Sequence, residues 1–264
     1  MITDFIYDGK ALSDFGYMVL FENTDESIPV SEMKFSEIKG SRSDVSQQVS
    51  YSYEDNYSCT FTVIKNLCNT NEKDEFLTND DVEELTRWLA RKTYKWFRFI
   101  DDDDDDEIWY QAQFSIHKEY VGDDVFGLSL TLDTNAPFGF TREIIVNPTI
   151  RNNSFSVPVY SDEEGYIYPD VVVTMAEAGE LIITNTAESR ETTLKNCVAD
   201  EVITFYGQNI NQITSTSTHD YAKDFNYNFP RFFTEYGDNT NQFTVNLDCT
   251  VKLIYRGIRK VGLH

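Results

Sequence analysis

Apolar and polar residues alternate over much of the chain. The clearest run extends from Phe243 to Leu253, where every second residue is apolar. A shorter run extends from Phe126 to Leu132, and further short runs are Cys59–Val63 and the apolar stretch Val171–Val173. A period of two gives a strand one buried face and one exposed face. Because Asn, Asp and Gly separate these short runs, the pattern predicts a mainly β protein built from β-sandwiches.

One segment has helical periodicity instead. Between Asp80 and Lys92 the apolar residues are spaced three or four apart, at Val82, Leu85, Trp88 and Leu89. This spacing predicts one amphipathic helix that lies against a sheet and is capped by Thr78 or Asn79. Acidic residues at its start and basic residues at its end suit the helix dipole. We expect a β-hairpin to follow, with arms at residues 94–100 and 108–116.

The two arms of that hairpin flank a strongly acidic segment. Six aspartates, Asp101–Asp106, are followed by Glu107. Adjacent carboxylates repel one another and are costly to bury, so the segment is predicted to be a solvated loop. Calcium binding is the less favoured alternative, because the helix–loop–helix calcium pattern needs Gly where this chain has Asp106 and Glu where it has Ala112.

Turn-forming residues mark a domain boundary near the middle of the chain. Asn135-Ala136-Pro137-Phe138-Gly139 and Asn147-Pro148 follow a completed strand and have the composition of a linker. We therefore predict two domains of ordinary size, residues 1–136 and residues 145–264.

Composition narrows the possible functions. The chain has 264 residues, of which 41% are hydrophobic and 14% aromatic, which is enough for a sizeable core and favours strands. With 45 acidic and 22 basic residues its net charge is −23, and such a surface repels phosphate backbones. We therefore expect no sequence-specific nucleic-acid binding. No apolar run approaches the roughly 20 residues that span a membrane, and the start lacks a secretory signal. Synthesis in the cytoplasm without secretion is the expectation.

No sequence motif indicates catalysis or metal binding. The four cysteines (Cys59, Cys68, Cys197, Cys249) and three histidines (His117, His219, His264) lack the close spacing of zinc ligands. Phosphate-binding loops, serine elbows and zinc-protease helices are absent. The adjacent acids Asp162-Glu163-Glu164 are explained by abundance in so acidic a chain. We assign no catalytic, cofactor-binding or metal-ligating residues and expect no enzyme, although folding could still assemble a site from distant residues.

Two stretches of the sequence carry motifs of a known family. Phe5-Ile6-Tyr7-Asp8-Gly9, followed by residues 12–17, is similar to the opening of the distal tail proteins of long-tailed (siphophage-type) bacteriophages and prophages. An ordered series resembles their galectin-like C-terminal β-sandwich domain, namely residues 165–170, 179–185, 194–196, 201–205, 228–232, 236–239 and 255–257. The Asn135-Ala136-Pro137 junction falls where the family's domains meet. Residues 39–44 depart from the Gly- and Arg-rich turn of many members.

The resemblance implies a structural virion protein at the tail tip or baseplate. Such proteins form a hexameric ring through their first domains, and the ring joins the major tail-tube protein to the tail-tip protein, which often carries a lysin. Their second domains project outward and in some relatives hold receptor-binding proteins or contact saccharide. Asp101–Asp106 is one candidate contributor to an acidic, DNA-repelling ring lumen, with a loop on the outer rim as the alternative.

A carbohydrate-binding module for host-surface attachment is the alternative function. Sugar sites use exposed aromatic side chains over a groove. Trp88, Trp96 and Trp109 all lie in the first half of the chain, which weakens this interpretation for the second domain.

Overall fold

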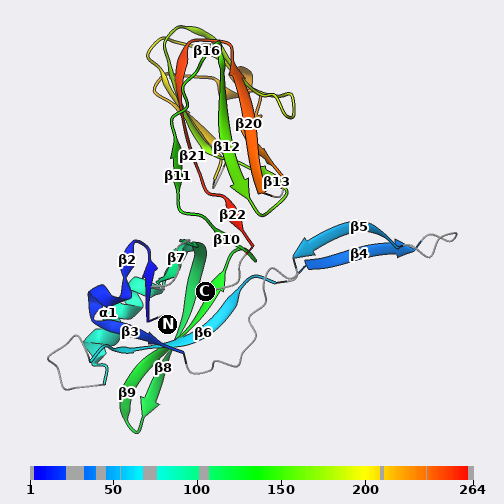
Figure 1. Ribbon diagram of the computed structural model, residues 1–264. Coiled ribbons are helices and arrows are strands. Elements are labelled where there is room, and N and C mark those ends of the chain that lie inside the picture. Colours follow the sequence, from blue (N-terminus) through cyan, green and yellow to red (C-terminus); the bar gives the residue numbers. More distant parts are fainter. Residues whose placement is uncertain are drawn as a thin grey trace. The chain divides into compact units, whose positions relative to one another are not determined.

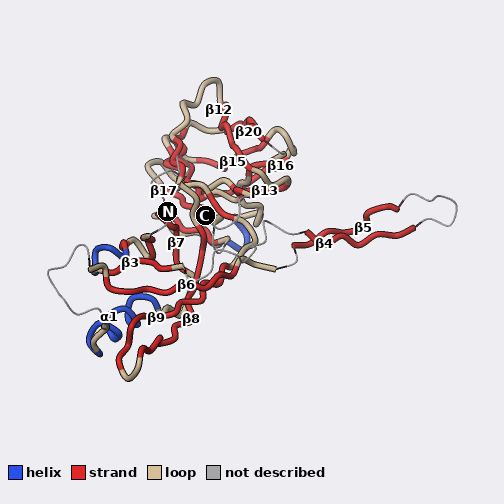
Figure 2. The backbone as a smooth tube through the Cα atoms, turned by 60° about the horizontal axis from the view of Figure 1, so that its bottom comes forward, coloured by secondary structure: helices blue, strands red, loops and turns tan. Residues whose placement is uncertain are grey.

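The computed structural model describes residues 3–21, 33–39, 46–53, 55–67, 76–100, 107–208, 211–235 and 237–260. The chain divides into two compact units (Figure 1). Unit 1 extends to Phe140 and also includes Lys260, which we had assigned to the second domain. Unit 2 is Thr141–Arg259, so the division falls inside the predicted linker. The predicted mainly β class is confirmed, since strands make up most of both units (Figure 2).

Unit 1 is organised around one seven-stranded sheet with the order β2-β1-β7-β8-β9-β6-β3. Strands β4 and β5 form a separate antiparallel pair. The elements are β1 (Asp4–Tyr7), β2 (Lys10–Ala11), a 3-10 helix (Leu12–Phe15), β3 (Tyr17–Leu20), β4 (Met33–Lys39), β5 (Ser46–Tyr53), β6 (Ser58–Lys65), α1 (Asn79–Leu89), β7 (Lys95–Ile100), β8 (Tyr110–Val121), β9 (Asp124–Thr134) and β10 (Gly139–Phe140).

The sheet of unit 1 rolls upon itself. The Val19 amide in β3 donates to the Thr3 carbonyl beside β1, at 2.9 Å, although the two strands stand far apart in the sheet order. Aromatic rings fill the enclosed core, and Phe5 alone contacts four of them, Phe61, Trp88, Phe97 and Phe114. Edge-to-face and stacked ring pairs of this kind add stability beyond the area that they bury. The two layers of unit 1 therefore come from a single curved sheet.

Helix α1 has the predicted face and cap. Val82, Leu85, Trp88 and Leu89 are buried. The Asp81 amide donates to the Thr78 hydroxyl and the Thr78 amide to the Asp81 carboxylate, which completes a capping box. The helix ends at Leu89, three residues before the predicted end, because Ala90 leaves helical geometry with ψ at 86°. No apolar side chain beyond Leu89 continues the buried face of the helix.

Two hairpins shape the sheet of unit 1. Asp8 and Gly9 form the turn between β1 and β2: both residues have positive φ, 50° and 79°, as a two-residue hairpin turn requires. The predicted arms after α1 form β7 and β8, which pair antiparallel. Strand β8 continues beyond Ile116 to Val121 and turns into β9, so the second predicted arm is longer than expected and its extension pairs with β9 (Figure 1). The Asp101–Asp106 segment lies outside the described residues.

Unit 2 is a sandwich of a five-stranded sheet, β11-β21-β14-β17-β18, and a four-stranded sheet, β12-β20-β15-β16. Its core comprises apolar residues from both sheets. The elements are β11 (Ile144–Val146), β12 (Ser154–Ser161), β13 (Gly165–Ile167), β14 (Asp170–Met175), β15 (Gly179–Asn185), β16 (Arg190–Cys197), β17 (Val202–Tyr206), β18 (Gln212–Ser215), α2 (Tyr221–Asp224), β19 (Phe232–Thr234), β20 (Gly237–Val245), β21 (Cys249–Tyr255) and β22 (Ile258–Arg259).

The longest alternating run of the sequence, 243–253, is not one strand, which corrects our interpretation of it. It contains the end of β20, a corner at residues 246–248 and the start of β21, and these two strands belong to opposite sheets. The Asn246 side chain fixes the corner by accepting from the Ile182 amide and donating to the Glu180 carbonyl. Alternation persists through the corner because the odd-numbered residues face the core in both strands.

Candidate functional site

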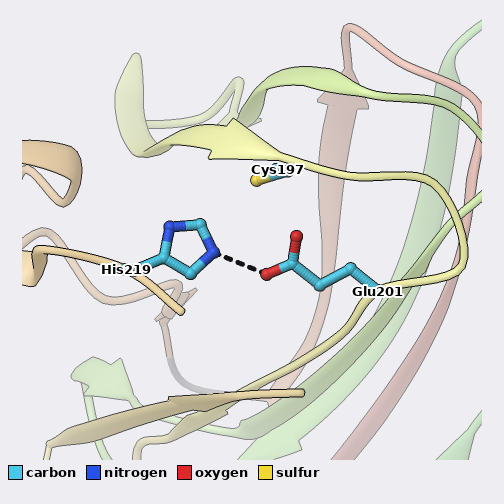
Figure 3. Close-up of side chains that lie close together, drawn as sticks. All are labelled: Cys197, Glu201 and His219. Carbon is cyan, nitrogen blue, oxygen red and sulfur yellow. Dashed lines mark hydrogen bonds and ion pairs between the residues drawn. The ribbon is translucent and has the colours of Figure 1, made fainter. Parts of the chain in front are cut away.

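Three side chains from separate segments of unit 2 meet in its interior (Figure 3). Cys197 is the last residue of β16, Glu201 lies in the connection between β16 and β17, and His219 lies between β18 and α2. The side chains of Glu201 and His219 have no exposed area, and Cys197 is 3% exposed. We call these three residues the Cys–Glu–His cluster.

Local backbone geometry and strand pairing bring the cluster together. Asp200 adopts a positive φ of 62°, which closes a tight connection from β16 to β17. Within this connection the Val198 amide donates to Glu201 Oε2 at 2.8 Å. Strand β17 pairs with β18, and Ser215 at the end of β18 donates its hydroxyl to Glu201 Oε1. His219 follows four residues later, with Nε2 at 2.6 Å from the same carboxylate oxygen.

The other side of the His219 ring faces a second carboxylate. Nδ1 is 3.6 Å from Asp224 Oδ2, which is an ion-pair distance but too long for a hydrogen bond, and Nδ1 has no hydrogen-bond partner. Asp224 is itself held in place by donation from the Asn196 side chain and the Asp220 amide. The imidazole thus lies between two carboxylates.

The protonation of the cluster follows from burial and hydrogen bonding. Burial by itself raises the pKa of Glu201, but donation from Ser215, Val198 and His219 outweighs it and lowers the pKa below its usual range. Burial raises the pKa of the Cys197 thiol to about 11. A thiol held protonated in a closed interior is a poor nucleophile, so the cluster does not have the character of a cysteine-hydrolase site.

Sequence reasoning missed this cluster and singled out residues that the structure keeps apart. His117 is exposed on β8, and Cys59 and Cys249 are partly buried on β6 and β21, in different units. Cys68 and His264 lie outside the described residues. The adjacent acids 162–164 include Asp162, which pairs with Arg259 at 3.8 Å. The one available signal was that residues 197–219 contain a cysteine, a glutamate and a histidine, but strand pairing is what unites them.

The phage tail protein N-terminal domain family matches residues 1–136, and the phage tail C-terminal domain family matches residues 138–255. The chain belongs to the phage tail protein family. The resemblance to distal tail proteins that the sequence motifs indicated is thereby confirmed at the level of family and fold. Among curated proteins, none matches this tail protein.

Two solved structures are similar to this tail protein over nearly its whole length. The Dit protein of phage SPP1, described as a paradigm of the hub adsorption apparatus in phages infecting Gram-positive bacteria, covers 97% of this chain and 99% of its own, with 12% identity and a TM-score of 0.64. A chain of the phage P2 baseplate, in its activated conformation with calcium, covers 97% of this chain and 98% of its own, with 9% identity and a TM-score of 0.47. Among the described residues of this tail protein, no helix is long and apolar enough to cross a membrane.

Proposed function

We propose that this tail protein is the hub of the tail tip or baseplate of a long-tailed phage or prophage. One observation carries the proposal: both units together have the fold of the SPP1 Dit protein, a hub protein, over 97% of the chain. The shared architecture includes both domains and their order along the chain. The similarity is therefore not limited to one common β-sandwich.

The hub would be a ring, which we infer to be hexameric, built from contacts between copies of unit 1. Strand β8 pairs with β7 only at Tyr110–Ala112, and from Gln113 onward its sole partner among the described strands is β9. Its outer half therefore presents an open edge, and unpaired edges are ready templates for another chain. Near the tip, Tyr120 and Val121 are each 58% exposed. A neighbouring copy could bury both, as a ring contact requires.

The ring would join the major tail-tube protein to the tail-tip protein that often carries a lysin, and unit 2 would be the part that holds receptor-binding proteins in phages that attach them to the hub. This role needs docking surfaces and no catalytic site. The Cys–Glu–His cluster supports a role without catalysis, because its glutamate and histidine side chains are closed to solvent and therefore to substrate.

A carbohydrate-binding module has less support. Tyr166 is an exposed aromatic residue of unit 2, but the guanidinium of Arg231 lies over its ring at 3.5 Å. That ring face is already occupied by a cation. Glycan-array binding by the full chain that is lost in Tyr166→Ala would revive the alternative.

Electron microscopy of phage particles tests the hub role directly. Gold-labelled antibodies against this chain should decorate one end of the tail, at the tip. Label distributed along the tail tube or on the capsid would refute the hub assignment, whatever the oligomeric state of the purified protein.

The proposed ring contact has its own test. Tyr120→Glu combined with Val121→Glu should prevent ring formation in assembled tails while leaving the melting temperature unchanged, because both side chains are exposed. Tyr227→Asp is the matched control: Tyr227 is 62% exposed in unit 2, and aspartate tolerates its positive φ of 59°. Normal rings from the double variant would place the contact elsewhere.

A further inference from the structure

We propose that Cys197, Glu201 and His219 form a zinc-binding site in unit 2. The sulfur of Cys197, a ring nitrogen of His219 and a carboxylate oxygen of Glu201 all lie within 4.8 Å of one another. At that spacing, small movements of the three side chains would bring all three atoms within bonding distance of one ion. The proposal is independent of the hub function, and it departs from the absence of metal ligands that the sequence predicted.

The chemistry of the three donors selects the metal. Thiolate, imidazole and carboxylate together are the ligand types of zinc, whereas calcium and magnesium require oxygen donors throughout. The cluster is closed to solvent, since the glutamate and histidine side chains have no exposed area. Closed sites of this kind stabilise a fold rather than activate water. The ion would therefore tie the β16–β17 connection to the segment before α2.

The surroundings of His219 fit a metal ligand. A histidine that binds metal through one nitrogen usually donates its other N–H to a carboxylate, which fixes the ring and increases its basicity. Here Nε2 points at Glu201, while Nδ1 is buried without a hydrogen-bond partner, 3.6 Å from Asp224 Oδ2. A small rotation of the ring toward Asp224 would satisfy this nitrogen and open the space on the Nε2 side.

Metal binding requires only local adjustment. His219 Nε2 and Glu201 Oε1 are hydrogen-bonded at 2.6 Å, whereas zinc ligands in a tetrahedron stand roughly 3.4 Å apart. Glu201 and His219 both lie in connections rather than strands, so their side chains can separate. The Cys197 thiol, which now donates to the Leu194 carbonyl, would lose its proton to solvent on binding zinc. The Ser215 hydroxyl, which is hydrogen-bonded to Glu201, is the available fourth ligand.

Charge balance also favours the ion. A divalent cation with one thiolate and one carboxylate gives a neutral buried group, which avoids the cost of an uncompensated interior charge. The carboxylate is already held in its ionised form by three hydrogen-bond donors.

The test uses the full-length protein stripped of metal with EDTA. After titration with zinc and dialysis, elemental analysis should find one zinc per chain, and the melting temperature of the protein should rise. Titration with cobalt should produce the near-ultraviolet charge-transfer band of a cobalt–thiolate bond. If the wild-type protein shows neither stoichiometric zinc nor this band, the proposal is wrong, and this result needs no variant.

Variants then locate the site. Cys197→Ser keeps a hydroxyl that can donate to the Leu194 carbonyl but should lose the charge-transfer band and the zinc-dependent rise in melting temperature. Cys249→Ser is the matched control, because Cys249 lies in the same unit but outside the cluster. His219→Gln should weaken cobalt binding while leaving the thiolate available. A band that survives Cys197→Ser or disappears in Cys249→Ser would refute the assignment.

Discussion

Replacing Glu201 by glutamine tests whether the buried carboxylate stabilises unit 2. The substitution preserves size and removes one negative charge. In the native protein Glu201 Oε1 accepts from Ser215 and His219, and Oε2 accepts from the Val198 amide. A glutamine side chain can keep its oxygen at only one of these positions. Its amide nitrogen would then face another donor at the other position.

The expected loss follows from the hydrogen bonds to the buried carboxylate, which contribute about 1.5–3 kcal/mol each when the acceptor is ionised. Because the glutamine oxygen retains part of the network, we take the equivalent of one such bond at the upper end, about 3 kcal/mol. For a domain of this size roughly 4 °C of melting temperature corresponds to each kcal/mol, so Glu201→Gln should melt about 12 °C below the wild type.

Differential scanning calorimetry at pH 7 with EDTA measures this effect without any contribution from metal. Glu164→Gln is the control, because Glu164 is an exposed glutamate of the same unit and should melt within about 2 °C of the wild type. If Glu201→Gln melts as close to the wild type as this control does, the carboxylate is solvated in solution and the reasoning about the cluster fails.

Three further predictions concern other parts of the fold. Trp88→Phe removes the donor at 3.1 Å from the buried Tyr7 carbonyl and should cost about 2 kcal/mol in urea unfolding; an unchanged midpoint would contradict this. Hydrogen bonds lower the pKa of Asp81 against the opposing effect of burial, so the wild type should exceed Asp81→Asn in melting temperature at neutral pH. This difference in melting temperature should shrink as the pH falls below about 4 and vanish as it passes through the lower folded-state pKa of Asp81. A difference independent of pH would show that the charge of Asp81 does not contribute to stability. Gly207→Ala would place a Cβ 2.4 Å from the Pro169 carbonyl oxygen and should cost about 2 kcal/mol or more, measurable as a lower melting temperature; wild-type stability would mean that the backbone relaxes.

The sequence predicted those elements that are determined by residues close together along the chain. Helix α1 was predictable because its apolar spacing and the Thr78–Asp81 capping box lie within a dozen residues. The turn at Asp8-Gly9 was predictable because few other residues tolerate two successive positive φ angles. The corner at 246–248 was not, since both flanking strands face the same core and the alternation therefore continues through it.

The Cys–Glu–His cluster depends on pairing that no local pattern encodes. Cys197 and Glu201 are close in sequence, but His219 joins them only because β18 pairs with β17 and returns the chain to the same end of the sheet. Taken alone, neither Cys197 nor His219 has a second cysteine or histidine at the close spacing of zinc sites, and Glu201 is one of 45 acidic residues. The burial of Glu201 is what distinguishes it, and burial is a property of the assembled sandwich.

The corner between β20 and β21 also restricts which insertions and deletions the sequence can tolerate. Side chains of successive strand residues point to opposite faces of the sheet. Deleting or inserting a single residue at 246–248 would therefore turn each side chain of β21 to the opposite face. Val251, Leu253 and Tyr255 would then turn toward water and the intervening polar residues toward the core. Surface loops in general tolerate changes in length. This three-residue connection, in contrast, should tolerate substitutions but no change in its length by an odd number of residues.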